Sequence, residues 1–98
     1  MTRRPSLYPT DGECFVCHTT RNIETHHIYP GSNRDRSDHE GCTVQLCHDH
    51  HQHPRFGAHG WDKRLDHWLR RDCQRRWEER EGATDHEAFR RLFYQSYL

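Results

Sequence analysis

Apolar residues change their spacing along the chain at residue 61. From that point six of them recur at intervals of three and four residues: Trp61, Leu65, Trp68, Leu69, Cys73 and Trp77. This spacing places them in one stripe on a helix, which we predict over residues 62–81. Gly82 follows where a glycine commonly ends a helix.

A second helix is predicted near the end of the chain. Thr84 and Glu87 have the spacing of a capping box, in which each side chain bonds the backbone at the start of a helix. The apolar side of this helix is formed by Ala88, Phe89, Leu92, Phe93 and Tyr97. Residues 61–98 therefore read as a pair of helices that pack on the preceding part of the chain.

The first half of the chain has shorter apolar groups. Residues 22–29 are β-prone and end at a Pro-Gly turn signal, and residues 42–47 alternate polar and apolar as a second strand would. Residues 31–41 are polar and charged, which predicts a loop. A short helix is expected from His48 to His53, before Pro54, followed by a connector with two glycines. Residues 1–12 lack periodicity and read as an irregular lead-in, so residues 13–60 form the predicted core.

Composition indicates how such a chain can be stable. Leu, Ile, Val and Phe supply only 14 of 98 residues, whereas the chain holds five Cys and eleven His. A small domain with so few core residues usually needs disulfides or a metal. The odd number of cysteines and the lack of a secretory signal favour reduced thiols, a metal and a cytoplasmic location. No segment is apolar enough to span a membrane, and a net charge of zero indicates no general positive field.

Four of the cysteines and histidines have the spacing of a zinc site. Cys14 and Cys17 form one knuckle, and Cys47 and His50 form another thirty residues later. Two such pairs of sulfur and nitrogen donors suit tetrahedral zinc, whose binding would replace part of the missing core. The alternative is that one pair is buried core cysteine by coincidence.

The remaining histidines suggest a second site. His26 and His27 are adjacent on the first predicted strand, so their side chains point to opposite faces. One of them can bind an ion while the other stays free as a base, a division that suits hydrolysis of a phosphodiester. His51 directly follows the zinc ligand His50, and His59 can join it if the connector folds back.

The same residues resemble the HNH endonuclease family. His26-His27, a second strand and Cys47-x-x-His50-His51 resemble its ββα-metal motif, an α+β, treble-clef-like hairpin and helix around one metal. Small phage and prophage members share the Cys-x-x-Cys opening, His26-His27-Ile28, a Val/Ala-His that matches Ala58-His59, and a C-terminal Tyr97-Leu98. The resemblance implies His26 and His51 as metal ligands and His27 as general base. It departs at Cys42, which stands where the family has its central Asn; Asn33 is another side chain that can serve.

The resemblance implies a metal-dependent endonuclease that cuts DNA, expected to be double-stranded, through water activated by His27. It implies a structural Zn²⁺ and one catalytic divalent cation (Mg²⁺, Mn²⁺, Ni²⁺ or Zn²⁺) held by His26, His51 and His59. The expected setting is bacterial or phage-infected host cytoplasm, beside phage packaging or recombination proteins. Two alternatives stay open: a non-catalytic zinc module that binds nucleic acid, and a structural or protein-interaction zinc domain.

Basic residues on the long predicted helix are candidates for contacts with phosphates. Arg64, Arg71 and Arg75 are the residues we select from this group. The alternative is an ordinary solvated face with pairs such as Asp66–Arg70 and Asp72–Arg76. The tryptophans of the helix are expected in the core rather than as a platform for bases, and Cys42 and Cys73 are expected to be buried.

Overall fold

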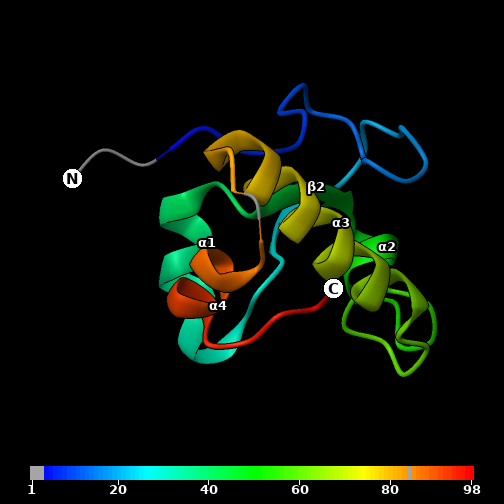
Figure 1. Ribbon diagram of the computed structural model, residues 1–98. Helices are drawn as coiled ribbons and strands as arrows, with labels where there is room; N and C mark the ends of the chain where they lie inside the picture. Colours follow the sequence, from blue (N-terminus) through cyan, green and yellow to red (C-terminus); the bar gives the residue numbers. More distant parts are fainter. Residues whose placement is uncertain (1–3, 84) are drawn as a thin grey trace.

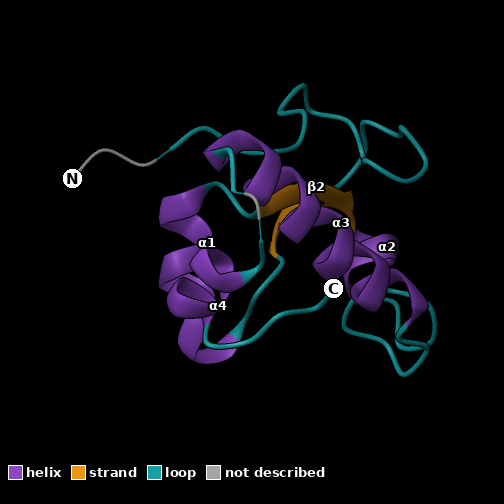
Figure 2. Ribbon diagram, viewed as in Figure 1, coloured by secondary structure: helices purple, strands orange, loops and turns teal. Residues whose placement is uncertain are grey.

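The computed structural model describes residues 4–83 and 85–98 as an α+β domain built on a small antiparallel sheet (Figures 1 and 2). In chain order its elements are β1 (Ile23–His27), the 3₁₀ turn η1 (Gly31–Asn33), α1 (Arg34–Glu40), β2 (Thr43–Cys47), α2 (His48–Gln52), α3 (Arg64–Glu81) and α4 (Glu87–Phe93). Both predicted strands and the short helix after the second are confirmed. No helix within the described residues is long and apolar enough to cross a membrane.

The sheet has two strands in a fixed register. Ile23 lies opposite Cys47 and His27 opposite Thr43, and α2 begins at the residue after β2 ends. One face of β2 is apolar because Val44 and Leu46 alternate with polar residues, and both are buried. The residue opposite Val44 is His26, which therefore shares the buried face of the sheet.

The connection between the strands differs from the sequence prediction. Residues 31–41, predicted as a loop, form η1 and α1 before Gly41 ends the helix at a φ of 79°. Helical periodicity of apolar residues is missing because α1 buries polar side chains. The hydroxyl of Ser37 donates to the carbonyl of Tyr29 (2.8 Å) and accepts from its N–H (3.1 Å). Polar contacts of this kind leave no mark in a hydrophobic pattern.

The two C-terminal helices supply much of the core. Leu69, Cys73 and Trp77 of α3 are buried with Phe89 and Phe93 of α4 in one cluster that includes the buried face of β2. The predicted stripe is wrong at its first tryptophan, because Trp61 precedes α3 and is 72% exposed. Trp68 is also 43% exposed, since it lies at the margin of the buried face.

The last helix is confirmed, with two differences in detail. It begins at Glu87, whose N–H donates to the Asp85 side chain (3.0 Å). The predicted capping residue Thr84 lies outside the described residues. Ala88, assigned to the apolar side, is exposed. The reason is that Phe89 and Phe93, one turn apart, face Tyr29 and the core, with Leu92 half-buried beside them, whereas Ala88 lies on the solvent side.

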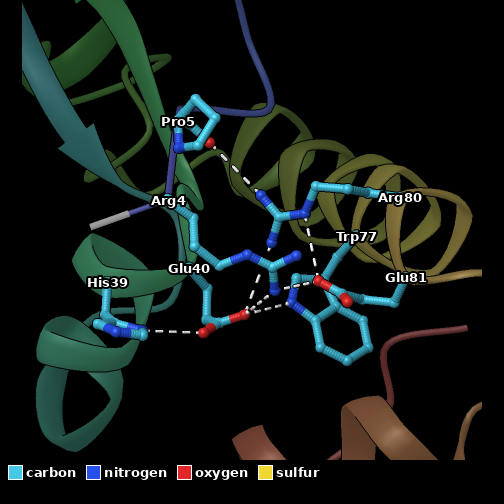
Figure 3. A network of polar contacts seen from close by, with 7 residues as sticks. All are labelled: Arg4, Pro5, His39, Glu40, Trp77, Arg80 and Glu81. Carbon is cyan, nitrogen blue, oxygen red and sulfur yellow. Dashed lines mark hydrogen bonds and ion pairs between the residues drawn. The ribbon is translucent and has the colours of Figure 1, made fainter. Parts of the chain in front are cut away.

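The described part of the lead-in is irregular, as predicted, but it packs against the helices. Tyr8 is buried and its hydroxyl donates to Asp72 of α3 (2.6 Å). Figure 3 shows a polar network centred on Glu40 of α1, whose carboxylate accepts from Arg4 (2.9 Å) and from the Trp77 indole (3.0 Å). Arg4 also pairs with Glu81. These contacts join the lead-in, α1 and α3.

Candidate metal centres

The first candidate centre is the cysteine–histidine cluster, defined as Cys14, Cys17, Cys47 and His50. A tight turn forms its N-terminal knuckle, with the His18 N–H donating to the Cys14 carbonyl (2.8 Å). The Phe15 N–H donates to the carbonyl of Gln45 (2.8 Å), which holds the knuckle against β2. Cys47 ends β2 and stands at the start of α2, so the two knuckles meet at this junction.

The distances within the cysteine–histidine cluster fit one ion. The Cys47 sulfur lies 3.2 Å from His50 Nδ1 and 3.9 Å from the Cys17 sulfur, and all four donor atoms lie within 4.8 Å of one another. Tetrahedral zinc, with bonds of about 2.0–2.3 Å, separates its ligand atoms by about 3.5–3.8 Å. The sulfurs form no disulfide. The four predicted residues are therefore brought together and can bind a metal.

The protonation of the thiols also bears on metal binding, because thiolates are the ligands. Burial alone would raise the pKa of Cys14, but hydrogen bonds from the backbone N–H groups of Cys17 and Cys47 outweigh it and hold the pKa below 9.0. Burial raises the pKa of Cys47. Cys14 therefore loses its proton more readily than Cys47.

The second candidate centre is the histidine trio, defined as His26, His51 and His59. The ring centroids lie 4.8–5.1 Å apart, and Nε2 of His51 is 3.1 Å from Nε2 of His59. Two imidazole nitrogens on one tetrahedral ion would be about 3.3 Å apart. The structure thus brings together the three histidines that the sequence analysis selected as ligands of a second ion.

His26 is the most constrained member of the trio. It is 1% exposed, and neither of its ring nitrogens has a hydrogen-bond partner. Burial, followed by the nearby charges of His51 and His59, lowers the pKa of His26 to about 3. Its imidazole is therefore neutral at pH 7 and keeps a lone pair for an ion. A buried imidazole without a partner is costly, and a metal at the trio would satisfy one of its two ring nitrogens.

A carboxylate orients the second member of the trio. Glu24 Oε1 accepts from Nδ1 of His51 (2.8 Å), while Oε2 faces Nδ1 of His48 (2.8 Å). Hydrogen bonds from His48 and then His51 lower the pKa of Glu24 to about 2, so the carboxylate is ionised and Nδ1 of His51 carries the hydrogen. Nε2 of His51, which faces Nε2 of His59, is then the nitrogen that can bind an ion. This carboxylate–histidine arrangement is common around protein metals.

Glu24 was not selected from the sequence. The available signal was its position two residues before His26, which puts both side chains on the same face of the strand. His48, the first residue of α2, contacts the same carboxylate.

The connector after α2 folds back and brings His59 to the trio. The His59 N–H donates to the carbonyl of His51 (3.0 Å), and the Ala58 N–H donates to that of His50 (2.8 Å). Gly57 and Gly60 allow this close return, because a Cβ at either position would lie within 2.5 Å of neighbouring backbone atoms. The expected connector with two glycines is confirmed, and its geometry supplies the third ligand candidate.

His27 points away from the buried face that holds His26. It lines an open cavity of about 280 Å³ together with His51 and His59 of the trio, Thr25, Pro30, Gly31 and Arg34. Nε2 of His27 lies 3.5 Å from Oδ1 of Asp38 in α1. The cavity is therefore lined by His27, which is outside the trio, and by His51 and His59, which belong to it. A side chain that can act as a base thus lies beside a candidate ion site.

Cys42 stands where the sequence resemblance expects an asparagine, and Asn33 was named as a side chain that can serve instead. Cys42 is fully buried, and its backbone N–H donates to the Ser37 carbonyl (2.8 Å). The Asn33 amide donates to the carbonyl of Phe93 (3.2 Å) and its oxygen accepts from Arg36 (3.2 Å). Asn33 thus links α1 to α4.

The predicted phosphate-binding arginines all lie on α3. Arg64 is held by Asp62 (2.7 Å), whereas Arg71 and Arg75 are exposed. Arg71 lines a separate cavity with His67, Arg70, Gln95 and Tyr97. The expected pairs Asp66–Arg70 and Asp72–Arg76 are present at 3.1 and 2.8 Å. Part of this face is therefore engaged in pairs within the helix.

Comparison of the chain with protein-family models, curated proteins and solved structures finds no match. The functional argument therefore rests on the two centres and the cavity beside them.

Proposed function

We propose that the chain is a metal-dependent endonuclease of the HNH type that hydrolyses phosphodiester bonds in DNA. The observation that carries the proposal is the pairing of His26, buried without a hydrogen-bond partner within the trio, with His27, which faces the open cavity. Adjacent residues of one strand thus have the two roles that such a hydrolysis needs. One imidazole holds an ion and its neighbour stays available for a proton.

The two centres suit different ions. Three sulfurs and one nitrogen favour zinc at the cysteine–histidine cluster, where four protein donors complete a tetrahedral set and give a structural site. The trio offers only nitrogens and leaves a coordination position open, as catalytic sites do. Imidazole suits Zn²⁺ and Ni²⁺ better than Mg²⁺, which prefers oxygen. We therefore propose Ni²⁺ or Zn²⁺ as better occupants of the trio than Mg²⁺ or Mn²⁺.

The proposed chemistry divides among this chain's own residues. An ion at the trio supplies neutralisation of charge on the phosphate and the leaving oxygen. His27 accepts the proton of the attacking water, and its Nε2 lies 3.5 Å from Oδ1 of Asp38. Glu24 holds the ring of His51 in the orientation that directs Nε2 to the trio. The cavity exposes His27 and two members of the trio, His51 and His59, to the same substrate group.

A plasmid-nicking assay with added Ni²⁺, Zn²⁺, Mn²⁺ or Mg²⁺ tests the proposal. His27→Ala should reduce cleavage by roughly 10²–10⁴-fold, the usual contribution of a general base, and leave the content of both metals unchanged. His26→Ala and His51→Ala should lose the second ion but keep the first. His67→Ala, which removes an exposed histidine from α3, is the matched control. If His27→Ala loses the ion and His26→Ala keeps it, the two roles are exchanged.

A second candidate function is a non-catalytic zinc module that binds nucleic acid. The observation that favours it is Cys42, a buried thiol at the position of the motif's asparagine. This candidate predicts binding of DNA without nicking under any of the four ions. A structural or protein-interaction domain predicts one tightly held zinc, no second ion and no affinity for DNA.

A further inference from the structure

Arg34, the first residue of α1, lies beside the candidate site. It lines the cavity of about 280 Å³ that contains His27 and two members of the trio. It also lines an adjoining cavity of about 390 Å³ with His27, Asp35 and Asp38. Arg34 thus stands next to the same imidazole in both cavities.

The guanidinium of Arg34 is exposed, and no hydrogen-bond or ion-pair partner for it occurs among residues 4–83 and 85–98. Other arginines near it in sequence or near the cavity are engaged. Arg36 donates to Asn33 and to the hydroxyl of Tyr94 (3.0 Å), and Arg70 pairs with Asp66. Arg34 is therefore a cation at the wall of the site whose donors are available to a ligand.

We propose that Arg34 binds a phosphate of the substrate backbone in the cavity that it shares with His27, His51 and His59. This inference rests on the proposed function, because it assigns a substrate contact at the same site. A guanidinium presents a planar fork of donors that can bind two phosphate oxygens at once. Asp35 and Asp38 line only the adjoining cavity, where their charges repel an anion. The phosphate therefore lies on the histidine side of Arg34.

The alternative is that Arg34 is simply a solvated charge on the surface of α1. An ordinary surface arginine contributes to the overall charge of the protein but makes no fixed contact with one phosphate. Arg91, on α4, provides the matched control because it is also exposed and its side chain has no hydrogen-bond or ion-pair partner among the described residues. Arg91→Ala removes the same charge as Arg34→Ala from a different helix.

Binding of a short fluorescent DNA duplex, measured by anisotropy over a series of KCl concentrations, tests the contact. The His27→Ala background prevents cleavage during the measurement, and the zinc-loaded protein is used throughout. Loss of one phosphate contact should reduce the slope of log affinity against log salt by about 0.9. We expect this reduction for Arg34→Ala, no change for Arg91→Ala, and a preserved slope for Arg34→Lys.

Cleavage by proteins with His27 intact provides a second measurement. Arg34→Ala should reduce kcat/KM by roughly tenfold or more, the loss expected for a charge-assisted bidentate contact. Arg34→Lys should recover only part of the activity, because an ammonium keeps the charge but not the fork. Arg91→Ala should cleave at the wild-type rate.

The outcomes separate this inference from the function on which it rests. A reduced salt slope for Arg34→Ala without cleavage by any form of the protein would support the phosphate contact and overturn the endonuclease. The contact would be overturned, and the endonuclease left intact, if the wild-type protein cleaves DNA and Arg34→Ala matches Arg91→Ala in both the salt slope of binding and kcat/KM. No measurable affinity for DNA would overturn both.

Discussion

The cysteine–histidine cluster and the histidine trio use consecutive residues of the same short helix but differ in their donors. His50 belongs to the first and His51 to the second, and successive residues of a helix point about 100° apart. The first centre has four donors, of which three are sulfurs, whereas the second has three nitrogen donors and borders an open cavity. Consecutive residues of α2 can thus connect a candidate site suited to stability with one suited to chemistry.

The largest expected effect comes from breaking the first centre. Cys47→Ser should lose zinc and unfold the domain, because structural zinc contributes about 10 kcal/mol or more to folding, as much as the whole stability of many small domains. His51→Ala, four residues later, should remain folded with one zinc. Metal analysis and thermal melting by circular dichroism measure both. An unchanged melting temperature for metal-free Cys47→Ser would contradict the structural role of this centre.

The next effect concerns the orientation of the second centre alone. Glu24→Gln removes the carboxylate that fixes His51, which should weaken ion binding at the trio by roughly 10–100-fold. Titration with Ni²⁺ on protein that already holds zinc measures this affinity. Glu87→Gln, an exposed carboxylate on α4, is the control. Loss of the first metal in Glu24→Gln would show that the two centres are not independent.

The two cysteines that border β2 allow a third test. Cys47 ends the strand and belongs to a candidate metal centre, whereas Cys42 directly precedes the strand and is buried at the position where the sequence resemblance expects asparagine. Cys42→Asn should lower the free energy of unfolding by about 1–3 kcal/mol, because it buries an amide without an assured partner, and should not increase cleavage. Chemical denaturation and nicking measure the two outcomes. Cys42→Ala controls for loss of the thiol, and faster cleavage by Cys42→Asn would show that the missing asparagine limits the reaction.

The smallest effect is expected in the polar network of Figure 3, which contains no metal ligand. Burial would raise the pKa of Glu40, but hydrogen bonds from Trp77, His39 and Arg4 outweigh it and hold the pKa below 4.5. A carboxylate with a lowered pKa stabilises the fold above its unfolded pKa, and this contribution is lost as the pH falls through the folded value. Glu40→Gln should therefore be less stable than wild type at pH 7, by roughly 1–2 kcal/mol.

Unfolding in urea from pH 7 to pH 4 measures the difference between the two proteins at each pH. The difference should begin to shrink as the pH falls below about 4.5, because the Glu40 carboxyl then takes up a proton in the unfolded chain before it does so in the folded protein. The zinc content is measured at each pH, and the two proteins are compared only where both keep the metal, because its loss would unfold both. A constant difference over this range would show that ionisation of Glu40 does not stabilise the contact between α1 and α3.

The predictions that succeeded depended on local spacing. Helix α3 follows the prediction to its end at Gly82, which has the left-handed φ of 68° expected there. The prediction of a loop between the strands was wrong because α1 buries Ser37 and Glu40 through hydrogen bonds rather than through an apolar face. The prediction that Trp61 is buried was wrong for the opposite reason. Trp61 continues the apolar spacing, but it lies in the connector, which places it in solvent.

The donors and their grouping could be predicted from the sequence. Two pairs of residues three apart fit a zinc site, and the adjacency of His26 and His27 requires opposite faces of a strand. How these residues meet depends on the folded chain. Glu24 reaches His51 because β1 lies beside α2, His59 joins the trio because the connector folds back over two glycines, and Arg34 stands beside His27 because residues 31–40 form η1 and α1. Such contacts depend on chain segments distant in sequence, which local spacing does not record.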